Sequence, residues 1–245
     1  MRFPDYELLT STSGVDRMPL RVARLQIALA LGADLDVRDN ASMTALHRAA
    51  QHAAEPLVHV LLSAGACPNH AGALARTPLH SAINPSSADQ LVSPIVRLLL
   101  NAGVPPSARD REGVTPLQLA ARCGMMSVAS LLLDLRVPAD QCDMSGLTPL
   151  HEAAMRGHAR MCELLLAHGA SVVRRNRFGC NAADFSRNAA SRRVLGLSPY
   201  DKDEVTAANG RRGLDKYPSE IASRSDRHGG IHDSTRDLYL SESVA

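Results

Sequence analysis

The chain has 245 residues, of which 45% are hydrophobic, so it can bury a sizeable core in one or two domains. Aromatic residues make up only 3% and tryptophan is absent, so this core must consist mainly of leucine, alanine and valine. The formal net charge of +2 does not by itself indicate a nucleic-acid or membrane-surface protein, and five cysteines without framework spacing argue against a disulfide scaffold.

The first 40 residues predict a pair of helices and no targeting segment. Acidic residues fall within the first seven positions, where a signal peptide needs an apolar run. A short helix is expected from Asp5 to Thr12 and a second from Pro19 to Leu31, followed by Gly32. The apolar stretch 22–33 is interrupted by polar side chains and is too short to span a membrane.

A four-residue motif then recurs along the chain. Its copies are Thr44-Ala45-Leu46-His47, Thr77-Pro78-Leu79-His80, Thr115-Pro116-Leu117-Gln118 and Thr148-Pro149-Leu150-His151. The first and third intervals are 33 residues and the second is 38. A glycine after a leucine-rich run recurs in the same register, at Gly32, Gly65, Gly103 and Gly169. A period of this length predicts a solenoid, a fold that usually works by presenting a surface.

The unit at 143–175 shows how one repeat is expected to fold. Gly146 suits a tight hairpin, Thr148 is a good N-cap, and Pro149 sits at the first helical position, where its missing N–H costs nothing. A first helix should end at Gly157 and a second should run from Ala159 to His168. Such a small pair cannot bury its own apolar face, so neighbouring pairs must stack.

Three positions depart from this pattern. Ser42 and Ala75 replace the turn glycine of the first two repeats, and Arg136 replaces a glycine that ends a second helix. Each of them must either adopt the unfavourable left-handed conformation or use another cap. The long interval comes from an insertion at 84–89, interpreted as a longer loop before a second helix that restarts at Ser93 and Pro94.

The C-terminal part changes character twice. Residues 181–196 are a degenerate version of the repeat opening and predict a capping repeat, whose outer face must be exposed to water. Serine, glycine, aspartate and arginine dominate after 196, which predicts a disordered tail over 197–245. A small apolar and acidic segment at 237–245 is interpreted as an inert end, a linear motif, or a segment that folds back on the cap.

The pattern resembles the ankyrin repeat over roughly residues 5–195, most specifically at 110–117 and 143–150. The resemblance implies an all-α solenoid of stacked helix-turn-helix units with hairpin loops. The expected divisions are a degenerate N-terminal repeat at 1–40, four repeats within 41–180 at about 41–73, 74–111, 112–144 and 145–177, a cap at 178–196 and the tail at 197–245. It also implies structural roles for the motif residues, which are Thr44, His47, Thr77, His80, Thr115, Thr148 and His151. Gln118 departs from the family pattern, so repeat 3 is expected to be looser.

Nothing in the sequence indicates an enzyme. No Cys-x-x-Cys, glycine-rich phosphate loop, Gly-x-Ser-x-Gly elbow or paired carboxylates in an apolar setting occur. We therefore expect no catalytic residue, no cofactor, no metal, no small-molecule substrate and no membrane partner.

A mixed apolar and basic groove is the candidate site. In ankyrin-like folds the residue before the motif threonine lies on the concave side, near the hairpin tips. The candidate partner-binding residues are Met43, Gln51, His52, Arg76, Arg111, Val114, Arg122, Met144, Leu147, Met155, Arg156, Arg175, Arg177 and Phe178. The alternative is that the slot before the threonine simply packs one hairpin against the next.

A basic cluster near the C-terminal cap is the second surface feature. Its arginines are Arg174, Arg175, Arg177, Arg187, Arg192 and Arg193, with Asp184 as the one acid among them. The N-terminal end instead carries Asp34, Asp36 and Asp39. Three interpretations stay open: a solvated polar cap, a site for an acidic segment such as the chain's own tail, and a nucleic-acid site.

These observations predict a protein–protein interaction module, an adaptor or scaffold that is monomeric alone and holds an unidentified protein partner in the concave groove. Because aromatic residues are scarce, the partner is expected to supply the aromatic anchors. The alternatives are a regulatory subunit of an enzyme complex and, more weakly, a nucleic-acid-associated protein that uses the arginine-rich cap. The odd number of cysteines favours the cytoplasm, with the nucleus as the alternative.

Overall fold

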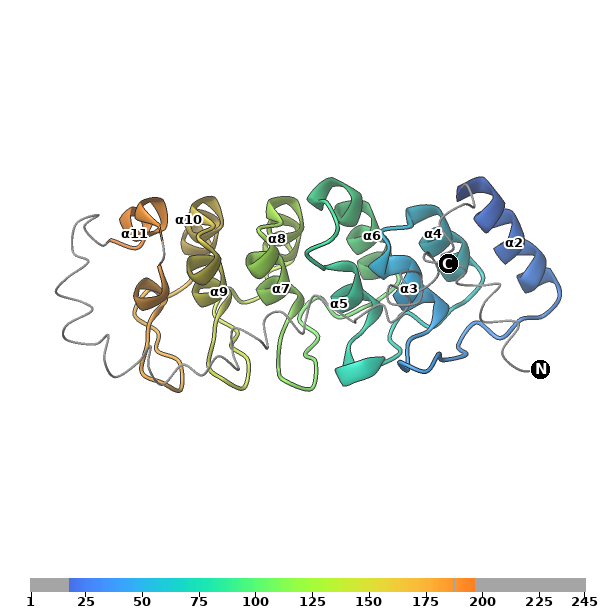
Figure 1. The fold of residues 1–245 in the computed structure, drawn as a ribbon, viewed down its shortest axis with the longest axis horizontal. Coiled ribbons are helices and arrows are strands. Elements are labelled where there is room, and N and C mark those ends of the chain that lie inside the picture. The colour runs from blue at the N-terminus through green and yellow to red at the C-terminus, as the bar shows by residue number, and fades with distance from the viewer. Residues whose placement is uncertain (1–17, 187, 197–245) are drawn as a thin grey trace, which may run out of the picture.

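Pairs of short helices stack side by side in chain order (Figure 1). The computed structural model describes residues 18–186 and 188–196, and this part of the chain contains helices and turns but no strand. The pairs are α3 (Ala45–Gln51) with α4 (Glu55–Ser63), α5 (Pro78–Ala82) with α6 (Asp89–Asn101), α7 (Pro116–Cys123) with α8 (Met126–Asp134), and α9 (Pro149–Arg156) with α10 (Ala159–Ala167). The predicted all-α solenoid is confirmed.

Single elements close the row at each end. Helix α2 (Met18–Ala30) lies beyond α4, where the sequence predicted a helix from Pro19 to Leu31. The 3-10 helix η2 (Ala182–Phe185) and α11 (Ala189–Val194) lie beyond α9 and α10. The helix expected from Asp5 to Thr12 and the tail expected over 197–245 lie outside the described residues.

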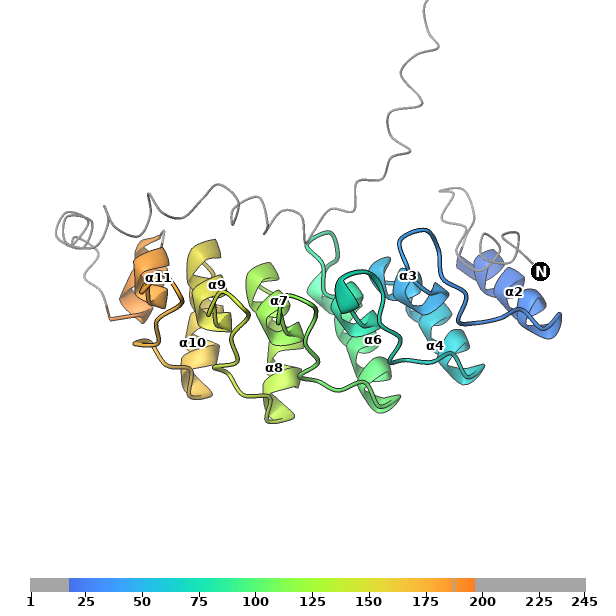
Figure 2. The same cartoon turned by 90° about the horizontal axis from the view of Figure 1, so that it is seen from below.

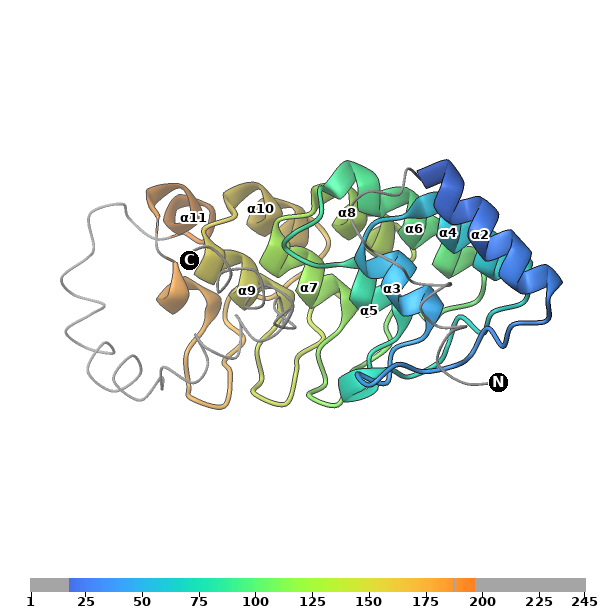
Figure 3. The same cartoon turned by 45° about the vertical axis from the view of Figure 1, so that its right-hand side comes forward.

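The helices form two rows with loops extending from one side. The row bends into a shallow arc, with α7 and α9 on its inner side and α8 and α10 on its outer side (Figure 2). Five loops precede the inner elements and lie beside one another in chain order (Figure 3). We call them fingers 1 to 5, residues 38–43, 71–76, 109–114, 142–147 and 175–180. Finger 2 contains the short 3-10 turn η1 (Ala73–Ala75).

Leucine and alanine build the core between the two rows. The leucine of each motif is fully buried, at Leu46, Leu79, Leu117 and Leu150. The outer helices contribute Leu61, Leu99, Leu132 and Leu165, which are equally buried. Alanine pairs such as Ala120–Ala121 and Ala153–Ala154 are buried on the inner helices. Their small side chains let neighbouring repeats approach closely, so a core without tryptophan can still be dense.

The three departures from glycine adopt the strained conformation. Ser42, Ala75 and Arg136 have φ of 58°, 57° and 59°, in the left-handed region. In the finger position of Ser42 and Ala75, Gly113 and Gly146 have φ of 79° and 77°. A side chain in this region costs roughly 1–2 kcal/mol per residue, because its Cβ crowds the backbone. These positions therefore keep the repeat's geometry at an energetic cost.

The predicted restart of the second helix at Ser93 and Pro94 is wrong. Helix α6 begins at Asp89 and contains Pro94 in its interior. It has 13 residues, whereas α4, α8 and α10 have nine each. Most of the insertion therefore adds a helical turn to α6. This added turn positions the carboxylate of Asp89 next to α8. The carboxylate accepts hydrogen bonds from the backbone N–H groups of Ser127 (2.8 Å) and Val128 (3.2 Å) at the start of that helix.

Candidate partner-binding surface

The motif histidine joins each inner helix to the next finger. The backbone N–H of Thr44 donates to Nδ1 of His47 (3.2 Å), so the ring proton resides on Nε2, which donates to the carbonyl oxygen of Arg76 (3.0 Å). His80 and His151 make the same bonds to the carbonyl oxygens of Val114 (3.2 Å) and Cys180 (3.1 Å). Burial lowers the pKa of His47 to about 4 and also lowers the pKa of His80 and His151. All three are neutral at pH 7.

The expectation that Gln118 loosens repeat 3 is wrong. Its Oε1 accepts a hydrogen bond from the backbone N–H of Thr115 (3.0 Å), and its Nε2 donates to the carbonyl oxygen of Leu147 (2.7 Å). Glutamine thus reproduces both bonds of the histidine, because its amide offers an acceptor and a donor at a similar reach. Gln118 is fully buried, like the histidines.

An aspartate or asparagine near the start of a finger shapes its turn. Oδ1 of Asp110 accepts from the backbone N–H groups of Glu112 and Val114, both at 2.9 Å. Asp39, Asp143 and Asn176 bind their own fingers in the same way. Gly72 takes this position in finger 2, where a Cβ would lie 2.8 Å from Sδ of Met43 and 3.0 Å from Nε2 of His47. These aspartate and asparagine side chains therefore point toward the backbone of their own fingers rather than toward solvent.

Backbone hydrogen bonds connect fingers 2 to 5 into one ladder. The N–H of Arg111 donates to the carbonyl oxygen of Leu74 (2.7 Å). The N–H of Met144 donates to Glu112 (2.9 Å), and that of Arg177 donates to Ser145 (3.0 Å). The donor is the third residue of its finger in all three links. The spacing of side chains along this face is therefore fixed by the backbone.

Ion pairs between repeats lie just inside the fingers. Nε of Arg76 is 3.3 Å from a carboxylate oxygen of Asp110, which is fully buried. Arg122 contacts both carboxylate oxygens of Glu152, at 3.1 and 2.7 Å, and both side chains are nearly buried. Burial by itself lowers the pKa of Arg122, but the charge and hydrogen bonds of Glu152 outweigh burial and raise it. Arg48 on α3 pairs with Asp39 of finger 1, the finger that leads into the same helix.

Comparison with known protein families identifies these repeats. A model of three ankyrin repeats matches residues 86–176, and a model of a single ankyrin repeat matches residues 42–73. Together they cover half of the chain. The chain belongs to the ankyrin-repeat family. A search of curated proteins found no match to it. Ankyrin repeats generally mediate protein–protein interactions and are typically not enzymes.

Three of the residues assigned to the groove are buried in the ankyrin core. Met43, Val114 and Leu147 are 4%, 2% and 3% exposed. They are buried in the ankyrin frame, so their side chains are not available at the surface as the groove assignment requires. The sequence pattern located the slot but could not show which way its side chain points.

Two arginines assigned to the groove instead join neighbouring repeats. Arg76 and Arg122 were expected to contact a partner, but each is held in an ion pair by the next repeat. The partner acids lie 34 and 30 residues further along the chain. Only stacking brings these residues together, so the sequence alone did not reveal the pairs.

The other predicted residues are accessible in two groups. Arg111, Met144, Arg175, Arg177 and Phe178 are exposed on fingers 3 to 5. Met144 is 58% and Phe178 42% exposed. The second group lies at the ends of inner helices, where His52 and Arg156 are exposed and Gln51 and Met155 are half-buried. Both groups therefore lie on the fingers or on the inner row of helices.

Sequence reasoning missed three exposed finger residues. Leu74 is 41% exposed on finger 2, in the same position as Phe178 on finger 5. Arg38 and Arg109, each the first residue of its finger, are exposed and donate to the carbonyl oxygens of Ala71 (3.0 Å) and Cys142 (2.5 Å) in the next finger. Aligning the fingers position by position would have revealed them.

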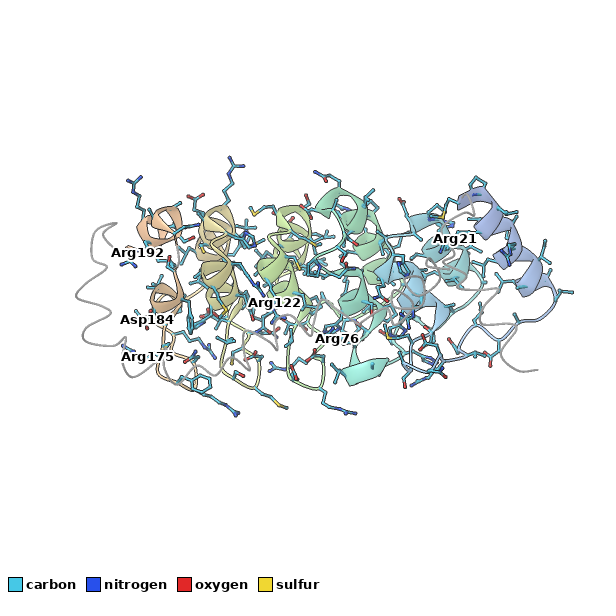
Figure 4. All side chains as sticks on the ribbon, viewed as in Figure 1. Arg21, Arg76, Arg122, Arg175, Asp184 and Arg192 are labelled. Atoms are coloured by element: carbon cyan, nitrogen blue, oxygen red, sulfur yellow. The ribbon has the colours of Figure 1, made fainter. Side chains whose placement is uncertain are left out.

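The arginines near the C-terminal cap are spread over two elements. Arg175 lies on the last finger and Arg192 on α11 above it, whereas Arg21 lies at the opposite end of the row (Figure 4). Asp184 accepts from the backbone N–H of Asn181 (2.8 Å) and so caps η2. Arg187 lies outside the described residues. At the other end, Asp36 lies 3.7 Å from His70, and Asp34 accepts from the backbone N–H of Asp36.

Within residues 18–186 and 188–196, no group of histidine, cysteine or acidic side chains is arranged to hold a metal ion. In the same part of the chain, no helix is long and apolar enough to cross a membrane. The five cysteines, which all lie in it, are thiols, and burial raises the pKa of Cys162 to about 11.

Proposed function

We propose that this ankyrin-repeat protein is an adaptor or scaffold that holds a protein partner against fingers 3 to 5 and the ends of its inner helices. The observation that carries the proposal is the contrast between buried side chains that join the repeats and exposed side chains that do not. The buried side chains include those of His151, Asp110 and Glu152, which form hydrogen bonds or ion pairs with a neighbouring repeat. Met144 and Arg111 are exposed on the ladder of fingers, and Arg156 is exposed on the inner helix α9.

A partner would meet few aromatic side chains on this surface. Phe178 is the only phenylalanine, tyrosine or tryptophan on the five fingers. Aromatic residues usually supply the anchors of an interface. We therefore propose that the partner brings the anchors, and that methionine and arginine here receive them. Arginine can stack on an aromatic ring, and the flexible thioether of methionine adapts to its shape.

Affinity purification of the full chain from cells that express it, followed by mass spectrometry, tests this function. Replacing Met144 and Met155 together by alanine should remove most of the captured partner. It should lower the thermal midpoint much less than the loss of a core side chain does, because Met144 is exposed and Met155, which packs against the core, is only half-buried. Leu147→Ala is the matched control, since it removes a buried side chain and should cost about 2–5 kcal/mol of stability.

A second control lies on the outer helices, where Arg97 and Arg160 are exposed on α6 and α10. If Arg97→Ala with Arg160→Ala reduces capture as much as the methionine variant does, the proposed surface is wrong. If the captured partner is the catalytic subunit of an enzyme, the alternative of a regulatory subunit is supported. Localisation in the cytoplasm or nucleus stays part of the proposal.

A further inference from the structure

Fingers 3 and 5 carry the same pair of outward-facing arginines. Arg109 and Arg111 flank Asp110, and Arg175 and Arg177 flank Asn176. All four arginines are exposed, whereas Asp110 and Asn176 are each 6% exposed and bind the amides of their own turns. The turn thus draws its acceptor side chain inward and leaves guanidinium groups on both sides of it.

Finger 4 places an apolar side chain between these pairs. Met144 is the third residue of its finger, as Arg111 and Arg177 are of theirs, and the backbone N–H groups of all three donate to the preceding finger. The three side chains therefore form one row in the order arginine, methionine, arginine. Met144 is among the most exposed large apolar residues of the described chain.

Two of the three acids on fingers 3 to 5 are held by groups outside the row. Asp143 is half-buried, and its Oδ1 accepts from the backbone N–H groups of Ser145 (2.8 Å) and Leu147 (2.9 Å). Asp110 is paired with Arg76. Glu112 is half-buried on finger 3, and its charge acts on Arg76, where it partly offsets the lowering of the pKa by burial. Arg174 adds a further positive charge, with Nη2 3.6 Å from Sγ of Cys142 on finger 4.

The spacing of the row matches a polypeptide in the polyproline II conformation. Packed helices lie about 8–10 Å apart, and neighbouring fingers share the spacing of their repeats. A polyproline II chain rises about 3.1 Å per residue with three residues per turn, so every third side chain lies on the same face and about 9 Å further along. A ligand that crosses fingers 3 to 5 therefore meets Arg111, Met144 and Arg177 at intervals of three residues.

We infer that the row Arg111–Met144–Arg177 binds an acidic segment of a protein partner in the polyproline II conformation, with two carboxylate side chains six residues apart and an apolar or aromatic side chain midway between them. This inference rests on the proposed function and specifies the partner's chemistry. Arginine binds carboxylate through charge-assisted, bidentate hydrogen bonds, and Met144 packs against the central apolar side chain.

The row fits this ligand better than a nucleic acid. Single strands are bound by basic grooves with several aromatic side chains for stacking, whereas Phe178 is the only aromatic residue on these fingers and Met144 breaks the charge at its centre. The chain's own segment 237–245 is a weaker match, because Asp237 and Glu242 are five positions apart. Both serve as alternatives in the test.

Fluorescence anisotropy with the full chain and the labelled peptide EESGFSGEE tests the inference. The peptide places phenylalanine three residues from a glutamate on each side. It should bind more tightly than the scrambled peptide FSEEEEGSG and more tightly than KKSGFSGKK, and its affinity should fall with added salt. Arg111→Glu with Arg177→Glu should weaken binding about tenfold or more. Arg97→Glu with Arg160→Glu, the same charge change on the outer helices, should weaken it less than about threefold.

Three outcomes would overturn the inference: no preference for EESGFSGEE over the scrambled or lysine peptides, equal losses in the two charge-reversal variants, or tighter binding of a single-stranded oligonucleotide or of a peptide covering 233–245. Met144→Ser should weaken the phenylalanine peptide but not a version with glycine at its centre. If binding of a captured partner requires Met155 and Arg156 but not Arg111 and Arg177, the proposed function stands. Only the inferred acidic ligand of the row is then refuted.

Discussion

The motif histidines of this chain act as neutral, two-sided hydrogen-bonding groups. Each receives the threonine N–H at Nδ1 and donates from Nε2 to the next finger, as His47 does to Arg76. A protonated ring would lose its acceptor and place a charge in a buried site. Gln118 fills the same position in repeat 3 with a side chain that does not titrate. The chain therefore contains its own comparison between a pH-sensitive and a pH-insensitive link.

Replacing His47 by glutamine should make the protein more tolerant of acid. Burial lowers the pKa of His47 to about 4, below the ordinary value of 6.5 in the unfolded chain. Between these values only the unfolded state binds the proton, so the stability from this residue is complete above pH 6.5 and falls towards pH 4. The loss is about 1 kcal/mol per pH unit.

Thermal melts at pH 7.5 and pH 5 measure this effect. The His47→Gln variant should lose less stability between the two values than the wild type and should match it within a few degrees at pH 7.5. Exposed His59→Gln on α4 is the control and should behave as the wild type. An unchanged acid sensitivity in His47→Gln would show that this link does not control the response.

At the scale of elements, one helix caps another across a repeat boundary. The residue before α8 is Met125, whose side chain offers no acceptor to the first amides of the helix. Asp89, in the added turn of α6, supplies both oxygens instead. A carboxylate at a helix N-terminus satisfies free N–H groups and complements the helix dipole. The insertion therefore stabilises the following repeat as well as lengthening its own.

Removing this carboxylate should destabilise the start of α8 and, to a smaller extent, that of α6, whose first turn contains Asp89. Asp89→Ala should lower the free energy of unfolding by about 1 kcal/mol, the usual cost of losing a cap. Asp134→Ala, at the other end of α8, removes an exposed acid from the C-terminal turn and should have little effect or stabilise slightly. Chemical denaturation of both variants measures the difference, and equal losses would contradict the capping role.

For the whole molecule, the repeat period was enough to predict the family, the solenoid and the inner and outer helices, because each unit depends on its neighbours for burial. Features that arise between repeats were not predictable in the same way. The burial of Leu147, the pairing of Arg122 with Glu152 and the start of α6 at Asp89 all depend on how one unit meets the next. The residues of the exposed row Arg111–Met144–Arg177 were named from the sequence, but the backbone hydrogen bonds that fix their order across fingers 3 to 5 were not predicted.

Backbone strain is distributed unevenly along this solenoid. Four of the five non-glycine residues with positive φ in the described chain lie in its first two repeats, at Ser42, Ala53, Leu74 and Ala75. The corresponding turns of repeats 3 and 4 use Gly113, Gly124, Gly146 and Gly157, which adopt these angles without strain. Since repeat proteins gain stability from each unit and its neighbours, the N-terminal repeats should open first.

Hydrogen exchange of the native protein tests this gradient. Backbone amides of α3 and α4 should exchange faster than those of α9 and α10, because local opening of the first repeats releases strain. Replacing Ser42 and Ala53 together by glycine removes roughly 1–2 kcal/mol of conformational cost per site, so the variant should slow exchange in α3 and α4 by about tenfold or more. Exchange in α9 and α10 should not change, since two repeats separate these helices from α3 and α4 and they open independently. Uniform exchange along the row, or slowing of all helices alike, would show that the solenoid opens as one cooperative unit and that the strain does not set where unfolding begins.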